Sequence, residues 1–152
     1  MLLSETLGER IVSKASAETL GSADGVIVDP ESPRIVAVRT GKGRKARVIP
    51  WETLSGVGDA AVVVEQDDAV REPSEGREHD QATDAVKVLG GLVVSDRGNE
   101  HGTITDIAFD AASGAVEEIR TSRSTTIIGE RIRSIGHYAW IVTAADDELG
   151  GL

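Results

Sequence analysis

The sequence contains an internal repeat, and this repeat restricts the possible folds more than any single residue does. Each copy opens with Leu-Gly, continues through a glycine into an apolar run that ends at an aspartate, and reaches a second apolar run that ends at an arginine. The matched positions are Leu7 and Leu89, Gly21 and Gly102, Asp29 and Asp110, Arg39 and Arg120, and Ile49 and Ile127. Past Arg39 the first copy carries a longer, basic connection at residues 41–45. The repeat predicts two related units that either have a core each or share one core.

Both copies have the composition and the patterning of β-strands. Val, Ile, Ala and Leu dominate the apolar residues, aromatic residues make up only 3%, and β-branched side chains favour strands. Ile107 and Phe109 occupy one side of a two-residue alternation and Asp106 and Asp110 the other, as in a strand with one buried face. Turn-forming residues follow at 29–33 and 110–114, and Pro50 is well placed to begin a short helical turn. We expect five or six short strands in each copy, folded into a small barrel or a strongly bent sheet.

The repeats divide the chain into four segments, which are repeat 1 at residues 1–66, an acidic linker at 67–84, repeat 2 at 85–146 and an acidic, glycine-containing tail at 147–152. The net charge of −10 is concentrated outside the repeats. The linker is polar and acidic and contains Pro and Gly, so it is expected to be flexible. Two units of this size bury a modest fraction of their surface. We therefore expect them to pack against each other or against a second copy, and we predict a homodimer.

The repeated pattern consists of glycines, one aspartate and a strand rhythm. It covers Leu7 to Ser13, Gly21, Val26 to Pro30, Ile35 to Val38 and Val48 to Trp51 in the first copy, and Leu89, Gly90, Gly102, Asp106 to Asp110 and Ser134 to Gly136 in the second. This pattern resembles the PRC-barrel family, whose β-barrel modules occur in the photosynthetic reaction-centre H subunit, in a bacterial ribosome maturation factor and in small stand-alone proteins of bacteria and archaea.

The resemblance implies an all-β protein made of two tandem small PRC-barrel-like β-barrels with short helical turns, of the stand-alone bacterial type. It also implies a binding or assembly module, and it offers no catalytic residues. Each copy departs from the pattern at one place. The first has Gly25 where the second has Asp106, and the second has Gly129 where the first has Trp51.

No constellation typical of catalysis or metal binding stands out in the sequence. There is no cysteine, and the carboxylates gather in the linker and tail, where no pocket would shift their pKa values for acid–base work. His101 lacks a second histidine at metal-ligand spacing. Asp29 and Asp110 fit turns in which the carboxylate bonds the backbone two residues further on. We therefore expect no enzyme activity, no metal and no cofactor.

The sequence also bears on location. Its start lacks the basic region and apolar run of a secretory signal, and no stretch approaches the roughly 20 apolar residues that span a bilayer. We expect a soluble cytoplasmic protein with no membrane span, for which peripheral association with a membrane stays open.

The candidate contact surface is basic. Nine residues form it, five in the first copy and four in the corresponding region of the second, namely Arg39, Lys42, Arg44, Lys45, Arg47, Arg120, Arg123, Arg131 and Arg133. If both groups lie on one side, they form a positive patch for phosphates or for an acidic protein. Alternatively, the charges prevent edge-to-edge strand pairing, or the cluster docks the chain's own acidic linker. Trp51 is a further candidate anchor, although Trp51, Tyr138 and Trp140 are expected to be buried.

These observations favour a non-enzymatic protein-interaction and assembly module, an adaptor that docks on a larger complex. A second hypothesis, by analogy with the family, is association with the ribosome or RNA. The net charge of −10 and the four aromatic residues argue against nucleic acid. A third hypothesis is a small ligand held between the two units, which requires a cleft at that place.

Overall fold

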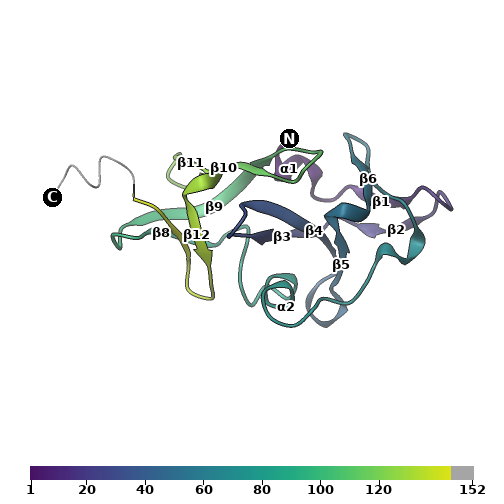
Figure 1. The fold of residues 1–152 in the computed structure, drawn as a ribbon, viewed down its shortest axis with the longest axis horizontal. Coiled ribbons are helices and arrows are strands. Elements are labelled where there is room, and N and C mark those ends of the chain that lie inside the picture. Colours follow the sequence, from purple (N-terminus) through teal and green to yellow (C-terminus); the bar gives the residue numbers. More distant parts are fainter. Residues whose placement is uncertain (145–152) are drawn as a thin grey trace.

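The computed structural model describes residues 1–144 and shows the same order of elements in both repeats (Figure 1). The strands of the first repeat are β1 (Arg10–Ser13), β2 (Thr19–Ser22), β3 (Gly25–Asp29), β4 (Arg34–Thr40), β5 (Arg47–Pro50), β6 (Leu54–Val57) and β7 (Ala61–Val64). Those of the second are β8 (Leu92–Ser95), β9 (Glu100–Phe109), β10 (Val116–Thr121), β11 (Thr126–Ile128), β12 (Ile132–Ile135) and β13 (Trp140–Val142). The helices are short, namely α1 (Leu3–Thr6), α2 (Arg77–Ala82) and the 3-10 turns η1 (Gly43–Lys45), η2 (Trp51–Thr53), η3 (Asp67–Ala69) and η4 (Gly129–Arg131). The all-β class is confirmed, and η2 is the helical turn expected after Pro50.

The two repeats pair their strands in the same way, with one difference. In each, the first strand lies parallel to the last, β1 with β7 and β8 with β13. The long strand β9 corresponds to β2 and β3 together. In the first repeat the chain bends between them, where Ala23 exchanges backbone hydrogen bonds of 2.8 Å with Gly8 and Glu9. As a result, repeat 1 has two sheets, β2-β1-β7-β6 and β3-β4-β5, whereas repeat 2 has one, β11-β10-β9-β8-β13-β12.

The expectation of barrels was wrong. None of the three sheets closes within residues 1–144. In repeat 2 the outer strands β11 and β12 do not pair with each other. In repeat 1 the bend after β2 separates the strands into two sheets, and the outer edges of β3 and β5 are covered by the segment that links the repeats rather than by further strands.

The repeats are joined through matched positions. Arg34 and Ala115, which correspond in the repeat, form an isolated antiparallel bridge. On one side of it Ile35 N donates to Gly114 O at 2.7 Å, and on the other Val116 N donates to Pro33 O at 2.9 Å. Because Ile35 matches Val116 and Pro33 matches Gly114, the contacts are reciprocal, as in an isologous two-fold interface. The chain thus folds as a pseudo-dimer of its own two halves.

The difference between Trp51 and Gly129 belongs to this junction. Trp51 is 8% exposed, meets Phe109 edge-to-face at 5.7 Å between ring centroids, and lies against Gly114. At the matched place, a Cβ on Gly129 would lie 2.0 Å from the carbonyl oxygen of Val116. Trp51 therefore packs against Gly114 of the other half. Gly129, which matches Trp51 in the repeat, lies where there is no room for a side chain.

One main hydrophobic core spans both repeats and includes Ile11 and Val62 from the first and Val93 and Ile119 from the second. The alternative in which the units share a core is confirmed. The start of the chain strengthens this union, since Met1 and Phe109 exchange backbone hydrogen bonds and α1 lies against β9. No helix among residues 1–144 is long and apolar enough to cross a membrane.

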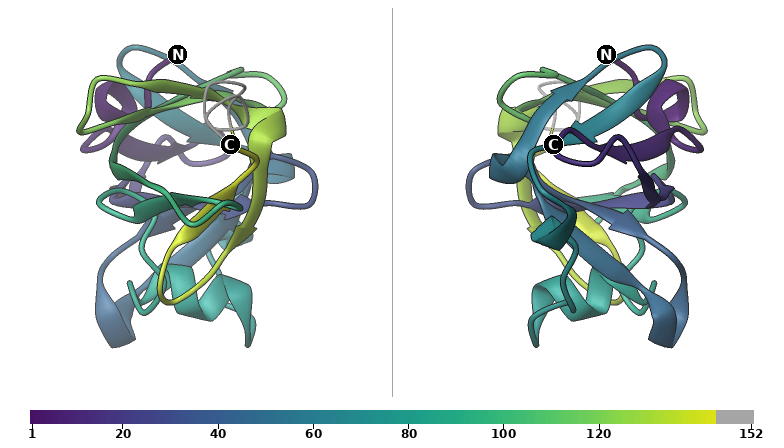
Figure 2. Two further views of the ribbon diagram at one scale, coloured as in Figure 1. Left: turned by 90° about the vertical axis from the view of Figure 1, so that its left-hand side faces the viewer. Right: turned by 90° about the vertical axis from the view of Figure 1, so that its right-hand side faces the viewer.

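The acidic linker, residues 67–84, is packed against repeat 1, contrary to the expectation of flexibility, and is called the strap below. Figures 1 and 2 show its helix α2 lying next to the β3-β4-β5 sheet. Ala82 is fully buried in a second, smaller core with Ile27, Ala37 and Val48. The strap therefore covers the face of this sheet that points away from the main core.

The strap also covers both edges of this sheet. On the outer edge of β3 the Gln81 side-chain amide accepts from Val28 N at 2.8 Å and donates to Val28 O at 2.9 Å, as a neighbouring strand would. On the outer edge of β5 the backbone of Arg71 exchanges hydrogen bonds of 2.9 and 3.0 Å with Val48. A polar composition did not prevent order here, because the buried groups of the strap have specific backbone partners.

Candidate functional site

The basic hairpin, residues 40–47, joins β4 to β5 and carries the first group of candidate residues. Its backbone turns through Gly41 and Gly43, whose φ values are +81° and +57°. The Asp24 carboxylate accepts from Gly41 N at 2.7 Å and from the Ser22 hydroxyl at 3.0 Å, which fixes the base of the hairpin. The longer connection at residues 41–45 is therefore the tip of a β-hairpin.

Three cations lie at the tip, Lys42, Arg44 and Lys45. All three are exposed, and none has a side-chain hydrogen bond or ion pair within residues 1–144. An exposed cation without a partner keeps its capacity to bind an anion from outside. The tip therefore presents three positive charges on a chain whose net charge is −10.

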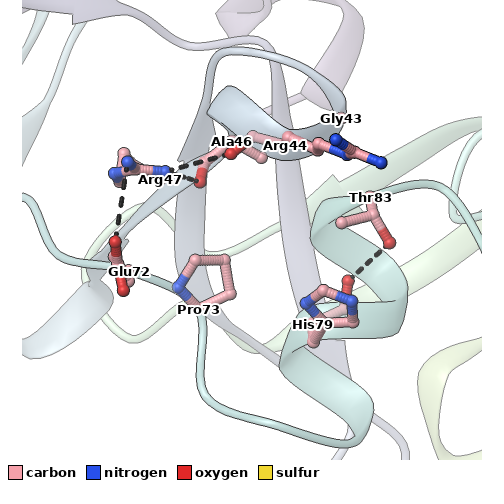
Figure 3. A pocket seen from close by; sticks show the side chains of 8 residues that line it. All are labelled: Gly43, Arg44, Ala46, Arg47, Glu72, Pro73, His79 and Thr83. Carbon is pink, nitrogen blue, oxygen red and sulfur yellow. Dashed lines mark hydrogen bonds and ion pairs between the residues drawn. The ribbon is translucent and has the colours of Figure 1, made fainter.

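A cavity of about 470 Å³ opens between the hairpin and the strap and is called the hairpin cavity (Figure 3). It is lined by Gly43, Arg44, Ala46 and Arg47 on the hairpin side and by Glu72, Pro73, His79 and Thr83 on the strap side. Figure 3 shows the hairpin above α2, which carries His79 and is followed directly by Thr83. Arg47 lies 3.7 Å from Glu72 and donates to the carbonyl of Ala46 at 2.9 Å, so its charge is engaged. In the described part of the chain, Arg44 lines this cavity without a side-chain hydrogen bond or ion pair of its own.

Arg39 has a different role, because the structure places it in the interior. Its side chain is 9% exposed and reaches the Asp84 carboxylate at 2.9 Å and the Asp24 carbonyl at 2.6 Å. A Cβ on Gly25 would approach the Arg39 guanidinium to 2.9 Å. This contact explains the first difference between the copies, since Asp106 pairs across the strands with the matched Arg120, which is exposed.

The basic residues of the second copy do not join the hairpin. Arg120 lies 3.3 Å from Glu118, and Arg123 lies 3.6 Å from Glu100. Arg131 and Arg133 donate to the backbone carbonyl and the hydroxyl of Thr143, respectively. Figures 1 and 2 show the β10–β11 turn far from the basic hairpin and α2. The nine candidates therefore do not form one patch, and the strap does engage two of them, Arg39 and Arg47.

The remaining sequence candidates lie in different surroundings. Trp51 and Trp140 are buried as expected, whereas Tyr138 is 79% exposed at the tip of the β12–β13 hairpin. The Asp110 carboxylate accepts from Ala112 N and Ser113 N at 2.8 and 3.1 Å, which confirms the predicted turn and lowers the pKa of Asp110. Residues 1–144 contain no group of three metal-ligating side chains close enough to hold an ion.

The strap contacts were not predicted from the sequence, nor was the acid that holds the strap at its start. The Asp67 carboxylate accepts hydrogen bonds from the hydroxyls of Ser13 and Ser16, and these bonds lower the pKa of Asp67. Gln81 carries no distinguishing signal in the sequence, since an isolated polar residue in an acidic stretch is normally solvated. The nearest signal is indirect: the first copy has Gly25 at the position of Asp106, across from the arginine that both copies share.

No model of a known protein family matches this chain, and no curated protein matches its sequence at a significant level.

Proposed function

We propose that this protein is a non-enzymatic interaction module of the cytoplasm that docks on a larger assembly by binding an acidic protein segment at the tip of the basic hairpin. The single observation that carries the proposal is the group of three exposed cations, Lys42, Arg44 and Lys45, that have no side-chain partner within residues 1–144. The resemblance of the repeats to PRC-barrel modules supports a role in assembly by analogy.

The surroundings of the tip favour an acidic protein over nucleic acid. The strap carries acidic side chains beside the hairpin, including Glu72 and Asp84, and these would repel a long phosphate backbone. The tip is small and carries no aromatic side chain for stacking on bases. A short acidic segment can bind Lys42, Arg44 and Lys45 at the exposed tip without entering the hairpin cavity, which Glu72 lines.

The test is affinity capture of the tagged full chain from lysate of its own cells, followed by mass spectrometry of the retained proteins. The variant Arg44→Glu/Lys45→Glu reverses two charges of the tip. The matched control, Arg10→Glu/Arg97→Glu, makes the same change of charge at two exposed arginines outside the site. We expect wild type and control to retain the same proteins at moderate salt and the tip variant to lose them.

Equal retention by all three proteins would overturn the proposal, as would capture of RNA that disappears with salt or nuclease. Self-association is a separate prediction from the sequence. Sedimentation of the purified chain tests it, with a dimer expected and a monomer at all concentrations refuting it.

A further inference from the structure

The strand β11 has an uncovered outer edge, although its counterpart in repeat 1 is covered. β11 ends the sheet of repeat 2 beyond β10 (Figure 1), as β5 ends the β3-β4-β5 sheet. On β5 the outward backbone groups of Val48 are bonded to Arg71 of the strap. Thr126 matches Val48 in the repeat and is exposed, and its backbone has no such partner within residues 1–144.

Two residues of β11 turn their backbone polar groups outward. Thr121 N donates to Thr125 O at 3.0 Å, so these two residues form a hydrogen-bonded pair. In an antiparallel ladder such pairs alternate with pairs that are not bonded to each other. Two residues further on, Ile127 is therefore bonded to β10, whereas the N–H and C=O of Thr126 and Ile128 on either side of it face away from β10.

β11 also lacks the irregularities that protect the other end strands. The pairings of β2 with β1, of β6 with β7 and of β12 with β13 each contain a register shift, whereas the pairing of β11 with β10 contains none. Bulges and charged side chains hinder an edge strand from pairing with a further strand. Residues 124–129 carry no charge, so β11 is a regular, uncharged edge.

The register of β11 fits a second copy of the same strand. When two β11 strands run antiparallel about a two-fold axis at Ile127, Thr126 of each copy lies opposite Ile128 of the other. These are the residues with outward groups, so the two pairs form four backbone hydrogen bonds. The Ile128 side chain is 54% exposed, whereas Ile127 is buried. Pairing with a second copy would cover Ile128 with a threonine, a favourable neighbour across strands.

The charges near β11 fit a second copy as well. Two chains with a net charge of −10 repel each other in general, and an uncharged segment lets them approach. The nearest charged residues on either side along the chain are Arg123 and Glu130. Because the strands run antiparallel, each end of the pair brings Arg123 of one copy toward Glu130 of the other.

From these observations we infer that β11 is the contact edge of a homodimer, in which the six-stranded sheets of two copies join edge to edge. The contact is isologous, since the same strand serves both copies. The inference does not depend on the docking of an acidic segment, because β11 lies far from the basic hairpin in Figures 1 and 2.

The decisive variant is Ile128→Pro, which introduces the residue that repeat 1 has at the matched position, Pro50. The φ of Ile128 is −67°, which proline adopts, and its N–H faces outward, so the fold should tolerate the change. In the dimer each copy loses a hydrogen-bond donor and an apolar side chain. We expect sedimentation of the full chain to show a concentration-dependent dimer for wild type and a dissociation constant at least about tenfold higher for Ile128→Pro.

Tyr138→Ser is the matched control, because it removes an exposed apolar side chain at the tip of the β12–β13 hairpin. It should dimerise like wild type. Hydrogen exchange of wild type locates the contact, since the amides of Thr126 and Ile128 should become protected as the protein concentration rises.

A wild type that stays monomeric at all concentrations would overturn the inference and leave the edge to a strand of another protein. Equal dimerisation of Ile128→Pro and wild type, loss of the dimer in Tyr138→Ser, or exchange of both amides that does not change with concentration would overturn it too. Arg44→Glu/Lys45→Glu should still dimerise, so failure of this inference leaves the capture experiment unaffected.

Discussion

Replacing Gln81 by alanine tests whether the strap is held by a side chain that substitutes for a β-strand. Gln81 is 2% exposed and Val28 is fully buried, so the variant removes two hydrogen bonds and leaves the N–H and C=O of Val28 without their partners. A net hydrogen bond contributes about 1 kcal/mol, and a buried polar group left unpaired costs about 1–3 kcal/mol, with some relief if water enters the space. We therefore expect Gln81→Ala to lower the free energy of unfolding by about 3 kcal/mol.

The assay is urea denaturation at pH 7, with hydrogen exchange of the Val28 amide as a local readout. Gln66→Ala is the matched control, because Gln66 is exposed and no hydrogen bond of its side chain lies within residues 1–144. It should change the free energy of unfolding by less than about 0.5 kcal/mol. If Gln81→Ala is as stable as this control and the Val28 amide stays protected, the strap is held by other contacts and the reasoning is wrong.

Two further predictions concern pH and packing. Burial raises the pKa of Glu78, but the hydrogen bonds from Arg71 and Ser74 outweigh it and hold that pKa below its ordinary value of 4.5. Ionised Glu78 thus stabilises the fold above pH 4.5, and this contribution is lost as the pH falls through the lower pKa of the folded state. Glu78→Gln should lower the free energy of unfolding at pH 7 by about 1 kcal/mol or less. It should also make this free energy fall less steeply with decreasing pH, as measured by denaturation from pH 3 to 7. A pH dependence with the same slope as in wild type would contradict this. Gly129→Ala should lower the free energy of unfolding by about 2 kcal/mol, because the new Cβ would clash with a backbone carbonyl of β10. Gly56→Ala, with open space around residue 56, should not lower it. Equal melting temperatures for the two variants would refute the packing argument.

The repeat was the feature from which most of the fold could be predicted. It gave the matched strands, the turn after Pro50 and the insertion that became the basic hairpin, because these features depend on local pattern and turn chemistry. The parallel pairing of β1 with β7 could not be predicted, since strands that lie far apart in the chain carry no local sign of their partner. The prediction of a closed barrel failed in repeat 1 for a related reason. The chain bends at Ala23, and this bend depends on backbone contacts with Gly8 and Glu9.

The candidate site was predicted less completely than the fold. Charge patterning indicated the basic hairpin, but it could not separate the free Arg44 and Lys45 from Arg39, which is buried beside Gly25. The strap was misjudged because composition alone predicts disorder. In the structure the amide of Gln81 bonds the backbone of Val28, which lies 53 residues away in the sequence.

The reciprocal contacts at Arg34 and Ala115 allow an asymmetry that two identical chains could not have. In a symmetric dimer every substitution enters both sides of the interface, so a tryptophan at the position of Trp51 would also stand at the position of Gly129, where a carbonyl leaves no room for it. With both halves in one chain, each side can change alone. The union of the halves also does not depend on protein concentration, so a partner that binds one half meets the other at a fixed place.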